Sequence, residues 1–173
     1  MARVYLGIGS NVGPVGNLRL GVRELQRQFG AIRLSPVYRS TPLGFEGDDF
    51  LNVVVALETD LSPQEVLQVI ERIHVRAGRQ RDAHKLVSRT LDIDLLLYDD
   101  LILDTPGLKL PRRDVLSYSF VLRPLAELAP EALHPVTGRS FREHWRQLQA
   151  GRGEDGVEEH PLEEADVNLL EDE

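Results

Sequence analysis

Two aspartates at alternate positions, Asp92 and Asp94, are the residues of this sequence best placed to do chemistry. Leu91, Ile93 and Leu95 occupy the positions around them. Successive side chains of a strand point to opposite faces, so the two carboxylates share one face, with their main-chain positions about 7 Å apart. Such a pair can hold one or two hard cations. Because the motif is short, a solvated polar face is the alternative interpretation.

Four basic residues precede this pair: Arg79, Arg81, Lys85 and Arg89. An acid pair beside a basic loop is what a metal-bound polyphosphate requires, because both the cation and the remaining phosphate charge find partners. Aspartate is also disfavoured in strands, and this strand is otherwise among the most apolar in the chain. The two acids therefore favour a functional site over a solvated face.

The elements that must position these residues follow from hydrophobic periodicity. They are strands over 4–9, 31–38, 51–57 and 90–97, and helices over 18–29, 63–77 and 141–148. The second helix has the strongest start signal, with Ser62 as N-cap, Pro63 at the first position and Glu65 completing a capping box. After the fourth strand, a turn and a second apolar run at 101–103 indicate a hairpin.

The order β-α-β-β-α-β predicts an α+β fold of the ferredoxin-like sandwich type, an antiparallel sheet with helices packed on one face. Gly7 and Gly9 lie in the first strand, and Gly13 lies in the turn that follows it. Their spacing is one residue longer than the dinucleotide-binding fingerprint. A tight turn that requires glycine is the preferred interpretation.

The composition is that of one ordinary globular domain, with 173 residues of which 42% are hydrophobic. The chain has no cysteine, which excludes disulfides, thiol catalysis and a thiolate zinc site. The N-terminus enters a strand pattern directly, and no apolar run approaches the roughly 20 residues of a membrane span. These features predict a cytoplasmic protein without a membrane partner.

The net charge of −8 is concentrated at one end of the chain. Residues 151–173 contain ten acids and one arginine, whereas residues 1–150 carry a net charge of +1. We therefore expect a single domain over 1–150, followed by an acidic, disordered tail that folding does not require and whose partner the sequence does not identify. A neutral body also argues against a nucleic-acid partner.

Four motifs in order resemble the hydroxymethyldihydropterin pyrophosphokinase family. The most specific is Arg89-Thr90-Leu91-Asp92-Ile93-Asp94-Leu95-Leu96. The others are Gly9-Ser10-Asn11, then Thr41-Pro42-Leu43-Gly44 with Phe50-Leu51-Asn52, and finally Phe120 with Pro124-Leu125. The resemblance covers about residues 3–135. It implies an enzyme of folate biosynthesis that moves pyrophosphate from ATP to a pterin alcohol and releases AMP.

The resemblance also implies roles for individual residues. Asp92 and Asp94 are expected to hold two Mg²⁺ ions that bridge the ATP phosphates, and Arg79 and Arg89 to complete the catalytic group. The residues expected to bind the pterin are Thr41, Pro42, Leu43, Gly44, Phe50, Asn52 and Phe120. The residues expected to bind the nucleotide are Leu67, Glu71, His74, Arg81, Lys85, Leu95, Arg112 and Tyr118.

The sequence departs from the family pattern on the nucleotide side. His74 replaces the usual glutamate, Leu86-Val87-Ser88 the frequent Trp-Gly-Pro, Arg112 a histidine, and Tyr118 an arginine. Two alternatives to an active pyrophosphokinase stay open. One is a pterin- or nucleotide-binding module with weakened transfer, and the other is a metal-dependent hydrolase or nucleotidyltransferase. The protein is expected to be a monomer.

Overall fold

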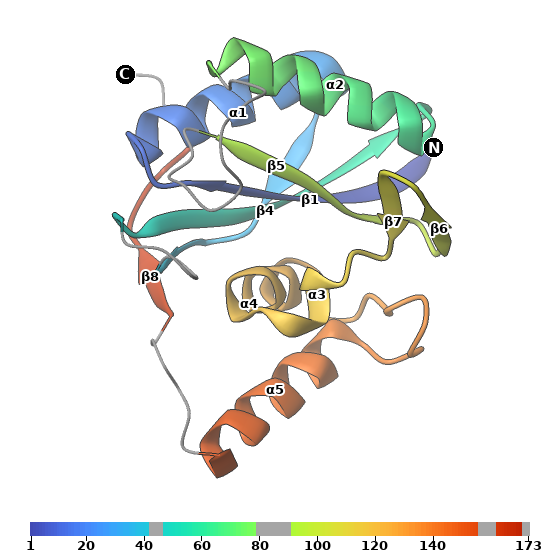
Figure 1. The fold of residues 1–173 in the computed structure, drawn as a ribbon. Coiled ribbons are helices and arrows are strands. Elements are labelled where there is room, and N and C mark those ends of the chain that lie inside the picture. The colour runs from blue at the N-terminus through green and yellow to red at the C-terminus, as the bar shows by residue number, and fades with distance from the viewer. Residues whose placement is uncertain (42–46, 79–90, 156–161, 171–173) are drawn as a thin grey trace.

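A six-stranded antiparallel sheet forms the middle layer of the structure, with helices on both sides of it (Figure 1). The computed structural model describes residues 1–41, 47–78, 91–155 and 162–170, without the side chains of 152–155. The strands of the sheet are β1 (Ala2–Ser10), β2 (Ile32–Leu34), β3 (Val37–Ser40), β4 (Phe50–Thr59), β5 (Asp92–Tyr98) and β8 (Glu163–Ala165). The helices are α1 (Pro14–Phe29), α2 (Pro63–Arg76), α3 (Asp114–Ser117), α4 (Ser119–Leu128) and α5 (Phe141–Asp155).

The strand order β5-β1-β4-β3, with β2 also paired to β4, is the order of a ferredoxin-like sandwich. This confirms the predicted fold class. The expected second strand over 31–38 is divided into β2 and β3, which pair with different parts of β4. The prediction that helices cover only one face is wrong, because α1 and α2 lie on one face and α4 on the other.

The two faces of the sheet belong to two separate cores. Val4, Leu6 and Ile8 of β1 pack with alternate residues of β4 and β5 under α1 and α2. On the opposite face, Tyr5 of β1 packs with residues of β4, β5 and α4, including Leu125. Strand alternation thus gives the sheet two apolar sides, and each needs its own helical layer.

The helix that leads toward the aspartate strand begins as the sequence predicts. The Ser62 hydroxyl accepts a hydrogen bond from the Glu65 amide at 3.2 Å, and the Glu65 carboxylate accepts one from the Ser62 amide at 3.0 Å. With Pro63 at the first position, this capping box fixes where α2 starts. Among the described residues, no helix combines the length and the apolar character that a membrane crossing requires.

The hairpin predicted between 90–97 and 101–103 is not formed. Instead β6 (Leu103–Thr105) pairs with β7 (Leu108–Leu110) in a separate two-stranded sheet. Gly107, at a φ of 82°, permits the tight turn between these two strands. The chain leaves β5 through Asp99, whose amide donates to the Arg3 carbonyl at 2.7 Å.

The acidic C-terminal segment is part of the sheet, so the expectation of a disordered appendage fails for its described residues, 162–170. β8 pairs with β3, and Leu169 is only 4% exposed within the core under α1. Arg19 of α1 donates to the Asn168 carbonyl at 3.1 and 3.3 Å, and Arg123 of α4 donates to the Leu162 carbonyl at 3.2 Å. Main-chain pairing and a buried leucine provide stability that the acidic composition conceals.

We expect replacement of Leu169 by alanine to destabilise the protein by about 2–5 kcal/mol, because it opens a cavity in the core. Leu170 is the matched control, since it is 59% exposed and its replacement by alanine should cost less than about 0.5 kcal/mol. Denaturant unfolding of the full-length variants measures both values. Equal effects of the two substitutions would show that 162–170 does not pack on the body.

Candidate functional site

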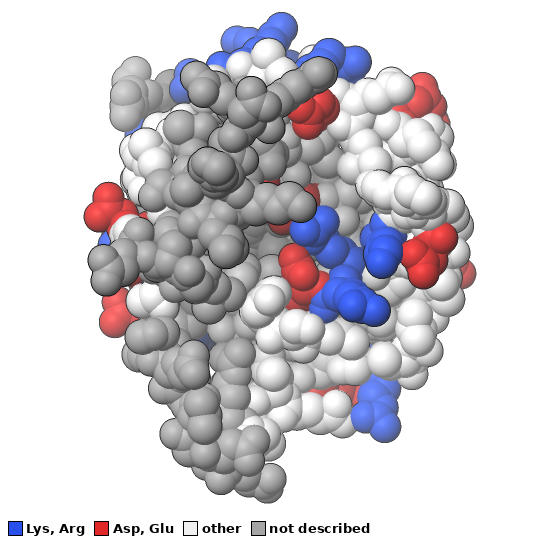
Figure 2. All heavy atoms as spheres, viewed as in Figure 1, with Lys and Arg blue, Asp and Glu red and all other residues white. Residues whose placement is uncertain are grey.

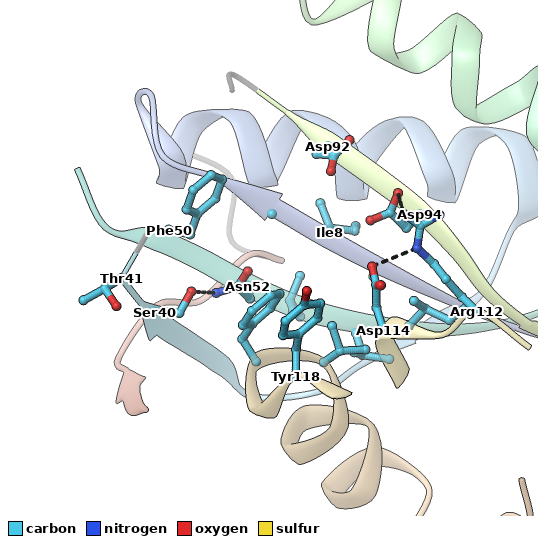
Figure 3. Close-up of a pocket in the computed structure, with 17 residues that line it drawn as sticks. Ile8, Ser40, Thr41, Phe50, Asn52, Asp92, Asp94, Arg112, Asp114 and Tyr118 are labelled. Carbon is cyan, nitrogen blue, oxygen red and sulfur yellow. Dashed lines mark hydrogen bonds and ion pairs between the residues drawn. The ribbon is translucent and has the colours of Figure 1, made fainter. Parts of the chain in front are cut away.

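A cavity of about 400 Å³ lies on the α4 side of the sheet, beyond the part of this face that α4 covers (Figure 3). β1, β4 and β5 contribute its floor, and α3 and α4 contribute one wall. The described lining residues are Gly7, Ile8, Gly9, Ser40, Thr41, Phe50, Asn52, Val53, Val54, Asp92, Asp94, Leu96, Arg112, Asp114, Tyr118, Phe120 and Val121. Apolar and charged side chains therefore meet in one hollow.

Two glycines of β1 separate the polar residues on the floor. In the strand register Gly9 lies between Asn52 of β4 and Asp92 of β5, and Gly7 lies between Val54 and Asp94. Neighbouring strands are about 4.8 Å apart, so Asn52 and Asp92 start roughly 10 Å from each other with no side chain between them. The missing side chains make room for a flat ligand whose two ends can reach the amide and the carboxylates.

The orientation of the Asn52 amide is fixed by the protein. Its Nδ2 donates to the Tyr38 carbonyl at 3.2 Å and to the Ser40 hydroxyl at 2.8 Å. A carbonyl can only accept, so the nitrogen must face Tyr38 and the oxygen must face the other way. Oδ1 lies over Gly9, where an added Cβ would be 3.2 Å from it. Asn52 thus presents an acceptor to the cavity.

Aromatic rings border the same hollow. Phe50 stands at the start of β4, and Tyr118 and Phe120 lie at the entry to α4. The rings of Tyr118 and Phe120 are stacked, with centroids 5.1 Å apart and planes 13° from parallel. These rings supply the flat, apolar surfaces that a planar ligand requires.

Asp92 and Asp94 point into the cavity from β5, while Leu91, Ile93 and Leu95 are buried in the opposite core. The predicted alternation of this strand is therefore confirmed. Arg112 lies between β5 and α3, with its Nη2 3.6 Å from Asp94 and its Nε donating to Asp114 at 3.0 Å. Burial opposes the guanidinium charge, but Asp94, Asp114 and Asp92 outweigh it and raise the pKa of Arg112. Figure 2 shows acidic and basic side chains next to each other near the centre of this face.

An extra residue in β5 provides a carbonyl to which the main chain of Arg112 is hydrogen-bonded. Tyr5 pairs with Leu97 and Leu6 pairs with Leu95, so Leu96 forms a bulge. The Leu96 carbonyl accepts a hydrogen bond from the Arg112 amide at 3.0 Å. This contact ties the segment that leads into α3 to the strand that carries the aspartates.

His74 supports the aspartate strand from α2. β5 is the edge strand, and the Ile93 amide between the two aspartates donates to His74 Nε2 at 2.8 Å. The side chain is buried, with Nδ1 3.6 Å from Glu71. Because Nε2 accepts, the ring carries its proton on Nδ1. Among the described strands β5 has a partner on one side only, and His74 accepts the hydrogen bond of an amide on its other side. The sequence pattern did not reveal this contact.

Eight of the predicted site residues meet at the cavity: Thr41, Phe50, Asn52, Asp92, Asp94, Arg112, Tyr118 and Phe120. Leu67, Glu71, His74 and Leu95 are not among its described lining, and Leu95 is buried in the opposite core. Pro42, Leu43, Gly44, Arg79, Arg81, Lys85, Arg89 and Leu86-Val87-Ser88 lie outside the described residues. Sequence reasoning missed Gly7, Ser40 and Asp114, although the Gly-x-Gly spacing on a strand was a usable signal for an open floor.

The fold is shared with solved structures of Plasmodium falciparum HPPK-DHPS. The crystal structure of Plasmodium falciparum HPPK-DHPS wild type superposes with a TM-score of 0.70 at 14% identity, over 89% of this chain and 46% of that one. The same protein in the structure titled with pterin and p-hydroxybenzoate gives a TM-score of 0.73 at 15% identity. This chain spans less than half of that longer protein, and the likeness defines its fold class.

Sequence comparison identifies the family within that class. Residues 5–130 match the model of 7,8-dihydro-6-hydroxymethylpterin-pyrophosphokinase (HPPK). The 2-amino-4-hydroxy-6-hydroxymethyldihydropteridine pyrophosphokinase of Aquifex aeolicus is 37% identical over 83% of this chain and 90% of its own length. The protein of the same name from Pseudomonas aeruginosa is 37% identical over 92% and 97%. The chain belongs to the HPPK family.

Replacement of His74 by alanine should destabilise the protein by about 1–3 kcal/mol, because the Ile93 amide loses its acceptor in a buried place. Glutamine at this position can offer a side-chain oxygen instead and should recover part of the loss. Thermal and denaturant unfolding of both variants measure the difference. If the alanine variant is as stable as the parent, the His74 contact does not support β5.

Proposed function

We propose that this chain transfers pyrophosphate from ATP to 6-hydroxymethyl-7,8-dihydropterin and releases AMP, as a step of folate biosynthesis. The observation that carries the proposal is the cavity in which an amide acceptor, aromatic rings and an aspartate pair surround two side-chain-free positions of β1. Membership of the HPPK family supports the same assignment.

The Asn52 side of the cavity suits a pterin. The pyrimidine edge of a pterin carries N–H donors, and Asn52 Oδ1 is an acceptor held in place by Tyr38 and Ser40. We assign Phe50 and Phe120 to the faces of the ring system and Thr41 to its edge, all of which line the cavity. A fixed acceptor discriminates against ring systems that cannot donate, because it would then be left buried and unpaired.

The Asp92 side suits the phosphates. Two carboxylates on one strand face offer the hard oxygen ligands that Mg²⁺ prefers, and phosphate oxygens and water can complete its coordination. No group of three or more potential metal-ligating side chains occurs among the described residues. We propose two ions at Asp92 and Asp94; when bound, they neutralise charge on the phosphates.

The transfer itself needs positioning more than side-chain chemistry. The pterin hydroxyl loses its proton to water as its oxygen forms a bond to the β-phosphorus of ATP. The bond from that phosphorus to the α-phosphate oxygen breaks, and AMP leaves with that oxygen. No covalent intermediate with the protein is required. Arg112 lines the cavity beside Asp94, and we assign it, together with Arg79 and Arg89, to the binding of phosphate oxygens.

The cellular setting is part of the same proposal. We propose that the protein acts as a monomer. The absence of cysteine from the sequence supports a reducing, cytoplasmic location.

Replacement of Asp92 or Asp94 by asparagine should reduce pterin-dependent AMP release at least about a hundredfold, since each removes a proposed metal ligand. The melting temperature should change little, because both carboxylates are only half-buried and a partly exposed ion pair such as that of Asp94 with Arg112 contributes little to folding. Asp104→Asn is the charge-matched control, as Asp104 is 82% exposed on β6. AMP release is measured with magnesium as the sole metal, and near-parental activity in either cavity variant would remove that aspartate from the mechanism.

Replacement of Gly9 by alanine should weaken pterin binding by about 1–2 kcal/mol, because the new methyl group meets the Asn52 oxygen at 3.2 Å. Gly16→Ala is the control, since a Cβ there meets nothing within 4 Å and should leave binding unchanged. Pterin titration by calorimetry compares the two variants. Equal affinity in both would contradict a ligand seated over the floor of the cavity.

A further inference from the structure

Arg112 is held at several points between the aspartate strand and α3. Its main-chain amide donates to the Leu96 carbonyl at 3.0 Å, and its Nε donates to Asp114 at 3.0 Å. The other end of the guanidinium places Nη2 3.6 Å from Asp94 Oδ1 (Figure 3). Val115, next to Asp114, is fully buried and anchors the start of α3. The position of this cation is therefore set by the fold.

We propose that Arg112 is an internal counter-ion that competes with a divalent cation for Asp94, and that Asp114 is the positioning residue that keeps it there. The inference rests on the proposed function, in which Asp94 binds the cation. A carboxylate already facing a guanidinium attracts a metal less strongly, and the guanidinium repels a second positive charge beside it. The described acids and bases that line the cavity are Asp92, Asp94, Asp114 and Arg112.

The same residue must have the opposite effect once nucleotide is present. A triphosphate brings negative oxygens that accept guanidinium hydrogens and offset the repulsion between Arg112 and the cation. Arg112 thus weakens the binding of the metal alone and strengthens the binding of the metal–nucleotide complex. The site then favours cations that arrive with a phosphate chain.

The first test measures the binding of the metal ion in the absence of nucleotide. Mn²⁺ is titrated against the full-length parent and Arg112→Ala, with free Mn²⁺ followed by electron paramagnetic resonance. Arg112→Ala should bind Mn²⁺ about two- to fivefold more tightly, the range for a partly exposed charge pair. Arg113→Ala removes the same charge one residue away, from an exposed side chain outside the described lining, and should gain less than Arg112→Ala.

The second test measures the affinity for a nucleotide analogue and examines the role of Asp114. The magnesium complex of α,β-methylene ATP, titrated by calorimetry, should bind more weakly to Arg112→Ala and to Asp114→Ala. Asp114→Asn keeps an oxygen acceptor for Nε and should recover most of the loss. In a background that already lacks Arg112, Asp114→Ala should cause no further loss, since a positioning residue has nothing left to position.

The outcomes separate this inference from the proposed function. If Asp94→Ala leaves Mn²⁺ binding unchanged, the metal assignment of the proposed function fails, and the competition fails with it. If Asp94→Ala weakens Mn²⁺ binding but Arg112→Ala does not strengthen it, only the counter-ion role is overturned. If Asp114→Asn loses as much analogue affinity as Asp114→Ala, the positioning role of Asp114 is overturned. Melting curves of all variants confirm that each is folded at the assay temperature.

Discussion

The side of the sheet that faces α4 is shared between an apolar half and a polar half, and the site depends on this division. Tyr5, Ala56 and Leu97 belong to the core under α4, whereas Asn52, Asp92 and Asp94 line the open cavity next to it. Because the opposite side of the same strands is continuously apolar under α1 and α2, a shift of register by one residue would bury the carboxylates. The core thus fixes where the polar residues point.

The two proposed ligand ends are held by different kinds of contact. Asn52 is fixed by hydrogen bonds to its own sheet, through Tyr38 and Ser40. The aspartate strand lies at the edge of the sheet, and its amide at Ile93 depends on His74 of α2. A change in α2 packing can therefore alter the Asp92 end of the cavity while it leaves the Asn52 end intact.

The C-terminal segment shows how composition can mislead. Residues 151–173 contain ten acids, yet β8 adds a strand to the sheet beside β3, and Leu169 enters the core. β3 also carries Tyr38, whose ring lies 4.7 Å from the Arg123 guanidinium and whose hydroxyl donates to Glu127 of α4. Because β8 pairs with β3, the segment stabilises the strand whose Tyr38 and Ser40 orient Asn52. Edge pairing requires main-chain groups and one buried anchor, and few hydrophobic residues suffice for that.

The sequence alone determined the sandwich topology, the start of α2 and the shared face of Asp92 and Asp94, because periodicity and capping act between residues close in the chain. Its family motifs also pointed to Phe50, Asn52 and Phe120. Only the tertiary structure decided that His74 supports Ile93, that a bulge at Leu96 recruits Arg112, and that Asp114 holds its guanidinium. The strands, helices and loops that meet in these contacts are brought together by packing, and hydrophobic periodicity does not encode which side chain will satisfy an edge amide or a bulged carbonyl.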